Sequence, residues 1–198
     1  MRELLVATHN KKKLEEIKDL LQNFPLKITS LQDYPDIPPV EEDGITFKSN
    51  ALKKAQAAAF YTKKLTLGED SGLEVKILRN QPGVYSARFS GEGATDEENN
   101  RKLLKMLEGV PAKQRQARYR SVAVLVIPGK TIAVATGSCQ GLIGLTPKGK
   151  NGFGYDPLFL IPRFQKTFGE LPPKIKSTMS HRSRALNKLK GIIQRYLA

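Results

Sequence analysis

Residues 4–13 of the chain read LLVATHNKKK, and this segment decides the fold. Its apolar start, Leu4–Ala7, is typical of a buried strand that stops at a hydroxyl and an amide. Apolar residues return at Leu14, Ile17 and Leu20, which is the spacing of a helix. The segment therefore predicts a strand, a tight loop and a helix.

The predicted helix begins with three lysines, Lys11–Lys13, after two residues that are good N-caps, Thr8 and Asn10. The first turn of a helix carries unpaired N–H groups and the positive end of the dipole, where cations are unfavourable. A bound anion such as a phosphate would explain their placement. A solvated lysine run behind an ordinary cap is the alternative.

The composition is that of a globular protein. The chain has 198 residues, of which 39% are hydrophobic and 26% charged. No apolar run approaches the ~20 residues that a membrane-spanning helix needs. Cys139 is the only cysteine, which excludes an internal disulfide and zinc sites built on several thiolates. We therefore expect a protein of the reducing cytoplasm that does not insert into membranes.

The net charge of +14 is unevenly distributed. Residues 1–108 carry equal numbers of basic and acidic residues, whereas residues 109–198 carry only two acids, Asp156 and Glu170. Such a field attracts polyanions or a highly charged small anion. General solubility is the alternative interpretation.

Periodicity and turn residues predict a mixed α/β sheet rather than a purely doubly wound one. Helices are expected over 46–59, from 95 to about 109, and after Ser180. Strand pieces are expected at 65–67 and 73–77 around a polar turn, followed by strands at 117–127, 131–139 and 158–161.

Two acidic clusters stand beside predicted loops, Glu41–Gly44 ahead of a helix and Glu69–Gly72 in the polar turn. Dipole partners and solvated turn acids are the ordinary explanations. The second cluster is closely flanked by apolar residues, and adjacent acids there need a cation or a proton. Mg²⁺ prefers a few carboxylates together with phosphate oxygens and water. The clusters and the lysine-rich loop therefore suggest a metal–triphosphate site.

The second half of the chain contains the segment NGFGYDP, Asn151–Pro157. Glycines on both sides of Phe153 allow the backbone to bend and present the ring, which could stack on a base. Asp156 could accept a hydrogen bond from a ring N–H or an exocyclic amine. The alternative is a turn whose aromatic rings fill the core.

His181 and Arg182 fall in the first turn of the last predicted helix, behind Ser180. They oppose the helix dipole as the early lysines do, and a bound acceptor would again explain this. An ordinary surface position is the alternative for His181.

Taken together, these segments resemble the non-canonical purine nucleoside triphosphate pyrophosphatases, the inosine/xanthosine triphosphatase family. The resemblance covers almost the whole chain, and it is specific because all six motifs occur in order. They are Thr8–Lys13, Glu41–Phe47 with Asn50-Ala51 and Lys54-Ala55, Glu69–Leu73, Pro82–Phe89, Gly152–Pro157 and Ser180–Arg182.

The resemblance implies an α/β fold in which a long twisted mixed β-sheet with flanking helices forms two lobes around an active-site cleft. Residues 1–198 would be one such domain. It implies Mg²⁺-dependent hydrolysis of ITP, dITP and XTP to the monophosphate and pyrophosphate, which cleanses the nucleotide pool. It also implies a homodimer, with no membrane partner and no stable nucleic-acid complex.

The motifs also assign roles to residues. Glu42 and Asp70 would hold the metal, and Asp70 would be the catalytic base for the attacking water. Ser71 would lie at the substrate. The triphosphate would be held by Thr8, His9, Asn10, Lys11, Lys12, Lys13 and Lys176. The base pocket would be formed by Phe153, Gly154, Tyr155, Asp156, His181 and Arg182. Donors such as Arg182 would accept a 6-oxo purine and be left unpaired by adenine.

The chain departs from the family pattern at three positions. The family usually has Asp at Glu69, a small residue at His9 and often Gly at Asn151. Two other functions compete with this one. A Maf-like pyrophosphatase for modified pyrimidines is disfavoured by the Phe153 loop and by Ser180–Arg182. A basic nucleic-acid-binding protein is disfavoured because its usual signatures are not evident and the acidic clusters would repel a polyanion.

Overall fold

A computed structural model describes residues 2–197, which divide into two compact units. Unit 1 contains the described residues up to Asp70, together with Ser121–Gly137 and the residues from His181 onward. Unit 2 contains Ser71–Arg120 and Ser138–Ser180. Three long strands contribute residues to both units, so each unit is built from segments distant in sequence.

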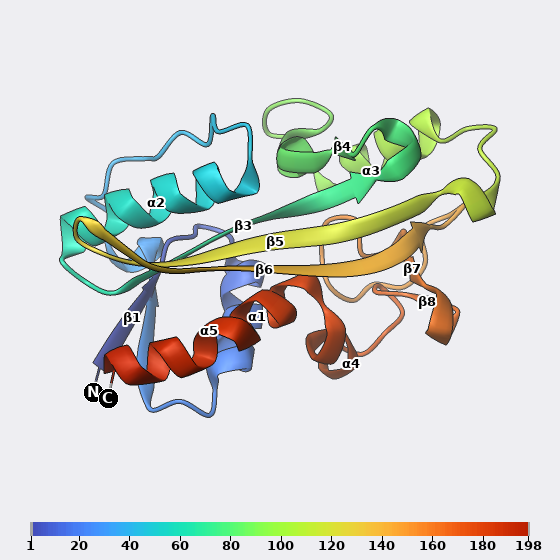
Figure 1. Cartoon of the computed structure of the whole chain (residues 1–198). Coiled ribbons are helices and arrows are strands. Elements are labelled where there is room, and N and C mark those ends of the chain that lie inside the picture. Colours follow the sequence, from blue (N-terminus) through green and yellow to red (C-terminus); the bar gives the residue numbers. More distant parts are fainter. Residues whose placement is uncertain (1, 198) are drawn as a thin grey trace. The chain divides into compact units, whose positions relative to one another are not determined.

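Within the described residues the strands follow the order β2-β1-β3-β5-β6-β7-β8, with β4 paired to β3. β1 is parallel to β2 and to β3, whereas the β3–β4, β6–β7 and β7–β8 pairs are antiparallel. The mixed sheet with flanking helices is confirmed (Figure 1). The strands are β1 (Arg2–Val6), β2 (Leu26–Ser30), β3 (Thr66–Val75), β4 (Gln81–Pro82), β5 (Gln116–Ile127), β6 (Lys130–Ile143), β7 (Phe159–Ile161) and β8 (Lys166–Thr167). The helices are α1 (Lys11–Leu21), α2 (Phe47–Thr62), α3 (Asp96–Met106), α4 (Pro173–Met179) and α5 (His181–Leu197).

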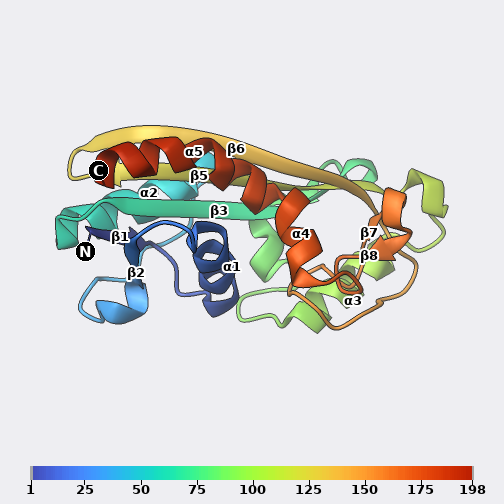
Figure 2. The same cartoon turned by 90° about the horizontal axis from the view of Figure 1, so that it is seen from below.

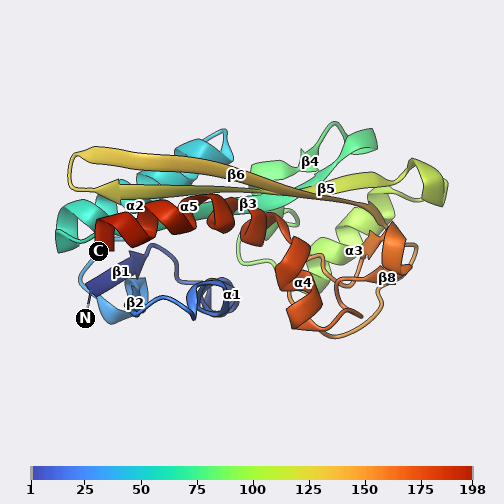
Figure 3. The ribbon, with the colours of Figure 1, turned by 60° about the horizontal axis from the view of Figure 1, so that its bottom comes forward.

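Unit 1 has helices on both faces of its part of the sheet, as Figures 1 and 2 show for α2 and α5. The two faces follow from the alternation of side chains along a strand. Leu4 and Val6 of β1 pack in a core with α1 and α5, and Leu5 and Ala7 pack in a second cluster that contains Ala58 of α2. The apolar run at the chain's start is therefore continuous because both of its faces are buried. Figure 3 shows β1 and β2 side by side, with α1 close by.

Small residues bring α2 and α5 close to the sheet. A Cβ added to Gly68 of β3 would lie 2.3 Å from the carbonyl oxygen of Ala51 and 2.8 Å from the Cβ of Ala55. One added to Gly137 of β6 would lie 2.1 Å from the carbonyl oxygen of His181 and 2.4 Å from the backbone N of Ala185. The absence of a side chain at Gly137 therefore sets where α5 begins.

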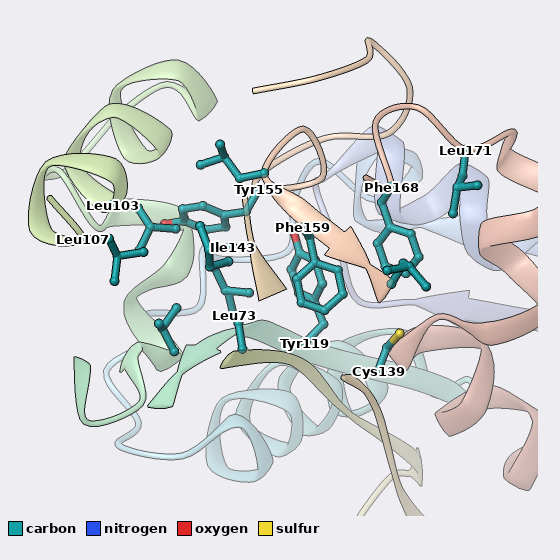
Figure 4. Close-up of a cluster of buried hydrophobic side chains, with 14 of the residues drawn as sticks. Leu73, Leu103, Leu107, Tyr119, Cys139, Ile143, Tyr155, Phe159, Phe168 and Leu171 are labelled. Carbon is teal, nitrogen blue, oxygen red and sulfur yellow. The ribbon is translucent and has the colours of Figure 1, made fainter. Parts of the chain in front are cut away.

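Unit 2 has an aromatic core. The Tyr119 and Phe159 ring centroids are 4.6 Å apart, and those of Phe159 and Phe168 are 5.2 Å apart. Tyr155 joins the same cluster beside Leu103 of α3 and Leu107, the residue that follows this helix (Figure 4). The aromatic rings thus supply much of the area buried in this unit.

The structure confirms the strand–loop–helix start, the hairpin of two long strands and the helices that begin after Thr46, Thr95 and Ser180. Two expectations were wrong. The segment 65–77 contains one continuous strand, β3, rather than two pieces around a polar turn. β6 extends past 139 to Ile143, because Gly141 lets the neighbouring strand approach: an added Cβ there would lie 2.5 Å from the Leu160 carbonyl oxygen. β2 and α4 were not anticipated.

None of the helices among residues 2–197 is long and apolar enough to cross a bilayer.

Glu3 is the centre of a charged cluster at the edge of unit 1. Its carboxylate accepts hydrogen bonds from Lys64 Nζ at 2.5 Å, Tyr34 Oη at 2.6 Å and Thr29 Oγ1 at 2.8 Å. Burial alone would raise the pKa of Glu3, but these bonds and the charge of Lys64 outweigh it and lower the pKa to about 2. The ionised carboxylate therefore stabilises the fold.

We predict that Gly137→Ala lowers the free energy of unfolding by about 2 kcal/mol, because the new methyl overlaps the backbone of α5. Gly191→Ala is the matched control, since no atom lies within 4 Å of a Cβ added there. It should stabilise the chain by roughly 0.5–1 kcal/mol through helix propensity. Urea titrations of both variants check this; equal effects would contradict the close approach of α5.

We predict that Glu3→Gln destabilises the protein at pH 7 and much less at pH 2.5. A folded pKa of about 2 against an ordinary value of 4.5 gives stability that is present above pH 4.5 and lost as the pH falls towards 2. Urea titrations of both proteins between pH 7 and 2.5 measure the difference. A difference in unfolding free energy that is constant over this range would rule out the ionised role.

Candidate functional site

The loop between β1 and α1 is capped by its own side chains. Thr8 Oγ1 accepts a hydrogen bond from Asn10 N at 3.1 Å, and Asn10 Oδ1 accepts one from Lys13 N at 3.0 Å. Lys11 and Lys12 are exposed in the first turn, which contains no acidic residue. The helix start therefore offers positive charge and backbone N–H groups to an anion.

His9 lies exposed in the same loop. Its carbonyl oxygen accepts a hydrogen bond from Gln32 Nε2 at 3.4 Å. This contact ties the loop to the segment that follows β2, so the backbone of His9 has a structural role of its own.

The acids Glu69 and Asp70 lie inside β3 and point to opposite faces of it. Glu69 lies on the same face of the strand as Leu67 and points towards Lys13 and Arg182. Asp70 lies on the opposite face, the face of Gly68, and points towards α2. This alternation explains how two adjacent carboxylates tolerate a buried strand, because each has its own polar partners.

Glu69 belongs to a buried network that links the starts of α1 and α5. Its carboxylate lies 3.2 Å from Lys13 Nζ and 3.3 Å from Arg182 Nη2, and it accepts a hydrogen bond from Ser121 Oγ at 2.7 Å. Burial alone would raise the pKa of Glu69, but the charges of Arg182 and Lys13 hold it well below its usual range. Arg182 also pairs with Glu16 of α1.

This network bears on the cations at the two helix starts. The sequence suggested that a bound group balances the cations at the starts of the first and last helices. For Lys13 and Arg182 the countercharge comes from Glu69 and Glu16 of the chain itself. Arg182 and His181 are also buried, so a surface position for His181 is excluded. Only Lys11 and Lys12 remain exposed in that first turn of α1.

Asp70 is held by two residues one turn apart on α2. Asn50 Nδ2 donates to Asp70 Oδ2 at 3.3 Å, and Lys54 Nζ lies 3.9 Å from Asp70 Oδ1. Lys54 Nζ also donates to Glu42 Oε2 at 2.8 Å and to the Glu69 carbonyl at 3.2 Å. The ammonium of Lys54 therefore lies close to both carboxylates that were predicted to bind the metal.

Asn50 also positions the loop that carries Glu42. Its Oδ1 accepts from Gly44 N at 2.7 Å and its Nδ2 donates to Gly44 O at 3.2 Å. A Cβ added to Gly44 would lie 2.4 Å from Asn50 Oδ1, so only glycine allows this approach. Neither Asn50 nor Lys54 was assigned a role from sequence. The available signal was two polar residues at helical spacing on the alanine-rich face of a helix.

The arrangement of Glu42 and Asp70 fits a divalent cation whose remaining coordination positions are filled by a bound substrate and by water. Burial raises the pKa of Asp70, because Lys54 and Lys13 only partly offset the lost hydration. A cation would supply the missing compensation. Among residues 2–197 no three His, Cys, Asp or Glu side chains form a metal cage. Mg²⁺ suits such a site, since it binds through one or two carboxylates with phosphate oxygens and water.

The remaining predicted residues lie in unit 2, where Ser71 is half-buried in β3. Asp156 is almost fully buried, and its Oδ2 accepts from Phe153 N at 2.9 Å and from Lys176 Nζ at 2.5 Å. Lys176 Nζ lies 5.0 Å from the centroid of the Phe153 ring. The structure thus brings Phe153, Asp156 and Lys176 together.

Tyr155 matches the alternative interpretation of this loop, in which an aromatic ring fills the core. Its ring lies in the core of unit 2, and its Oη donates to the Ser86 carbonyl at 2.8 Å. Burial raises the pKa of the hydroxyl, with a further contribution from the charge of Asp96. The ring therefore anchors the loop.

Comparisons with known proteins give a consistent result. A sequence model described as the Ham1 family matches residues 4–192. A "dITP/XTP pyrophosphatase" of Desulforamulus reducens is 49% identical over 192 residues, which are 97% of this chain and 96% of that protein. One of Geobacter sulfurreducens is 50% identical over 190 residues, 96% of each chain. A HAM1 protein structure from Coxiella burnetii superposes with a TM-score of 0.88 at 37% identity, covering 98% of this chain and all of that one. The structure of the Staphylococcus aureus Ham1 protein superposes with a TM-score of 0.86 at 36% sequence identity, with the same coverage of both chains.

We predict that Lys54→Met lowers the free energy of unfolding by about 2–4 kcal/mol, because it leaves buried Asp70 without its cation. The double variant with Asp70→Asn should recover part of this loss. Lys53→Met is the matched control, since Lys53 pairs with exposed Asp43 and its loss should be much smaller. Urea titration of the parent, Lys54→Met, Asp70→Asn and the double variant gives the coupling, with Lys53→Met titrated beside them. A loss that Asp70→Asn does not reduce would contradict the assigned contact.

Proposed function

The chain belongs to the Ham1 family, and on this premise we propose that it hydrolyses dITP, XTP and ITP to the nucleoside monophosphate and pyrophosphate. Removal of these non-canonical purine nucleotides would cleanse the nucleotide pool. The names of the relatives support this function over hydrolysis of modified pyrimidines and over nucleic-acid binding.

The observation that carries the proposal is the juxtaposition of an anion site and buried carboxylates in unit 1. The cationic start of α1 is joined to β3 through the 3.2 Å contact between Lys13 and Glu69. Asp70, the next residue, lies with Glu42 around Lys54. A triphosphate needs positive charge and N–H donors, and its hydrolysis needs a positioned proton acceptor.

Asp70 is our candidate for that acceptor. It is a buried carboxylate that directly follows Glu69 of the cationic network in β3, which places it to accept a proton from an attacking water. Asn50 and Lys54 fix its two oxygens. Glu42 and Asp70 would hold Mg²⁺, which when bound neutralises phosphate charge.

Triphosphate binding is assigned to residues of both units by the family motifs, and we retain it as a proposal. In unit 1 these residues are the loop Thr8–Asn10 and the lysines Lys11–Lys13. In unit 2 it is Lys176, which already pairs with Asp156, while Ser71 would lie at the substrate. Neutralisation of Lys12 would test the first group without touching a buried contact.

Base recognition is assigned to Phe153, Gly154, Asp156, His181 and Arg182, together with the Tyr155 backbone. The Phe153 ring is half-buried between glycines, which supports stacking on a flat purine. Glu16 and Glu69 fix the orientation of Arg182.

We further propose a cytoplasmic homodimer in which residues 1–198 form one domain with two lobes. The single buried cysteine and the absence of a membrane-spanning helix among residues 2–197 are consistent with this localisation. Sedimentation of the purified protein tests the dimer directly.

We predict that ITP with Mg²⁺ yields IMP and pyrophosphate, because attack falls between the α- and β-phosphates. Orthophosphate should appear only after inorganic pyrophosphatase is added. Chelation of Mg²⁺ should abolish turnover. A panel with dITP, XTP, ATP and modified pyrimidine triphosphates gives the selectivity, for which we expect a preference for 6-oxo, non-canonical purines. Formation of IDP with orthophosphate in the absence of pyrophosphatase would contradict the assignment.

A further inference from the structure

Both polar groups of the Gly154 backbone are bound by side chains of α3. Gly154 N donates to Asp96 Oδ2 at 2.7 Å, and Asn100 Nδ2 donates to Gly154 O at 2.9 Å. Asp96 and Asn100 are four residues apart on one face of α3, which lets them reach the same residue from one side. These contacts form a two-point clamp on one glycine.

Gly154 has a φ of +62°, in the left-handed region, and a Cβ added there would meet only Tyr119 Oη, at 3.9 Å. Glycine adopts this conformation readily, and the two hydrogen bonds from α3 supply a restraint that packing at this position does not.

The clamped glycine lies between the two side chains that the loop presents. Phe153 precedes it, and Asp156 follows two residues later and accepts from Phe153 N at 2.9 Å. Movement of the Gly154 peptide would therefore turn the Phe153 ring and loosen the bond that orders Asp156.

The side chain of Asn100 lies in an energetically unfavourable environment. It is buried, and its Oδ1 has no hydrogen-bond partner among residues 2–197. The preceding Asn99 uses both ends of its amide, accepting from Ser90 N and donating to Ala87 O. A buried acceptor without a partner is destabilising, so stability alone does not explain an amide at position 100.

We propose that Asp96 and Asn100 are positioning residues for base selectivity, which act by fixing Gly154 and through it the Phe153 ring. This inference rests on the proposed function, in which Phe153 contacts the purine. The clamp itself is a property of unit 2 and is testable without any substrate.

The first experiment reads the loop directly. The chain contains no tryptophan, so Phe153→Trp creates a single indole in the clamped segment, which can be excited selectively over the tyrosines. In this background, Asn100→Leu and Asp96→Ala should each raise the acrylamide quenching constant of the indole about twofold or more, because the loop gains mobility. Glu97→Ala is the matched control and should leave it unchanged, since it removes the same charge from the same turn.

Thermal stability separates positioning from a structural role. Asn100→Leu keeps the branched shape and removes the unsatisfied Oδ1 together with the bond to Gly154 O, so its Tm should fall less than that of Asn99→Leu. Amide exchange at Gly154 in the Phe153 chain gives a second measurement of the clamp, and we expect faster exchange in Asp96→Ala. Unchanged quenching and exchange in both clamp variants, or equal losses of Tm at 99 and 100, would overturn the proposal.

The kinetic arm uses the native Phe153. Both clamp variants should raise the KM for ITP about tenfold and lower the preference for ITP over ATP, with kcat changed by about twofold or less. A fall in kcat at constant KM and selectivity would overturn the positioning role. An inactive wild-type protein would contradict the proposed function, while the quenching result would still test whether Asp96 and Asn100 fix Gly154.

Discussion

The arrangement of unit 1 depends on the alternation of side chains along β3 at Glu69 and Asp70. One acid turns towards α1 and α5 and the other towards α2, so a single buried strand serves two chemically different surroundings. Glu69 neutralises Lys13 and Arg182, which join three elements of unit 1. Asp70 keeps a charge that is only partly compensated. The same strand thus carries a structural carboxylate and the proposed proton acceptor.

Glycine and alanine make this arrangement possible. Gly68 lets α2 approach β3 closely enough for Asn50 and Lys54 to reach Asp70. Gly137 lets α5 approach β6 closely, and Arg182 of α5 reaches Glu69. Gly44 admits Asn50 to the loop of Glu42. The contacts that Asn50, Lys54 and Arg182 make therefore lie beside places where a larger residue would overlap its neighbours.

Local signals predicted much of this chain. The apolar start, the helices that begin near Asn10, Thr46 and Thr95 and the long hairpin are decided by neighbours in sequence, and they were predicted correctly. Glu69–Gly72 was misread as a turn, because the partners that allow acids in a buried strand lie far away in sequence. Lys54 was missed as a site residue for the same reason.

The most direct test of this account compares Glu69→Gln with Asp70→Asn in the same two assays. Glu69→Gln should lower the free energy of unfolding by up to about 3–5 kcal/mol, since it removes the charge shared by Lys13 and buried Arg182 and leaves Arg182 with Glu16 alone. Asp70→Asn should leave stability unchanged or higher, because it removes an under-compensated buried charge, and should lower kcat by at least ~10². The account is contradicted if Glu69→Gln retains full stability, or if Asp70→Asn retains full turnover.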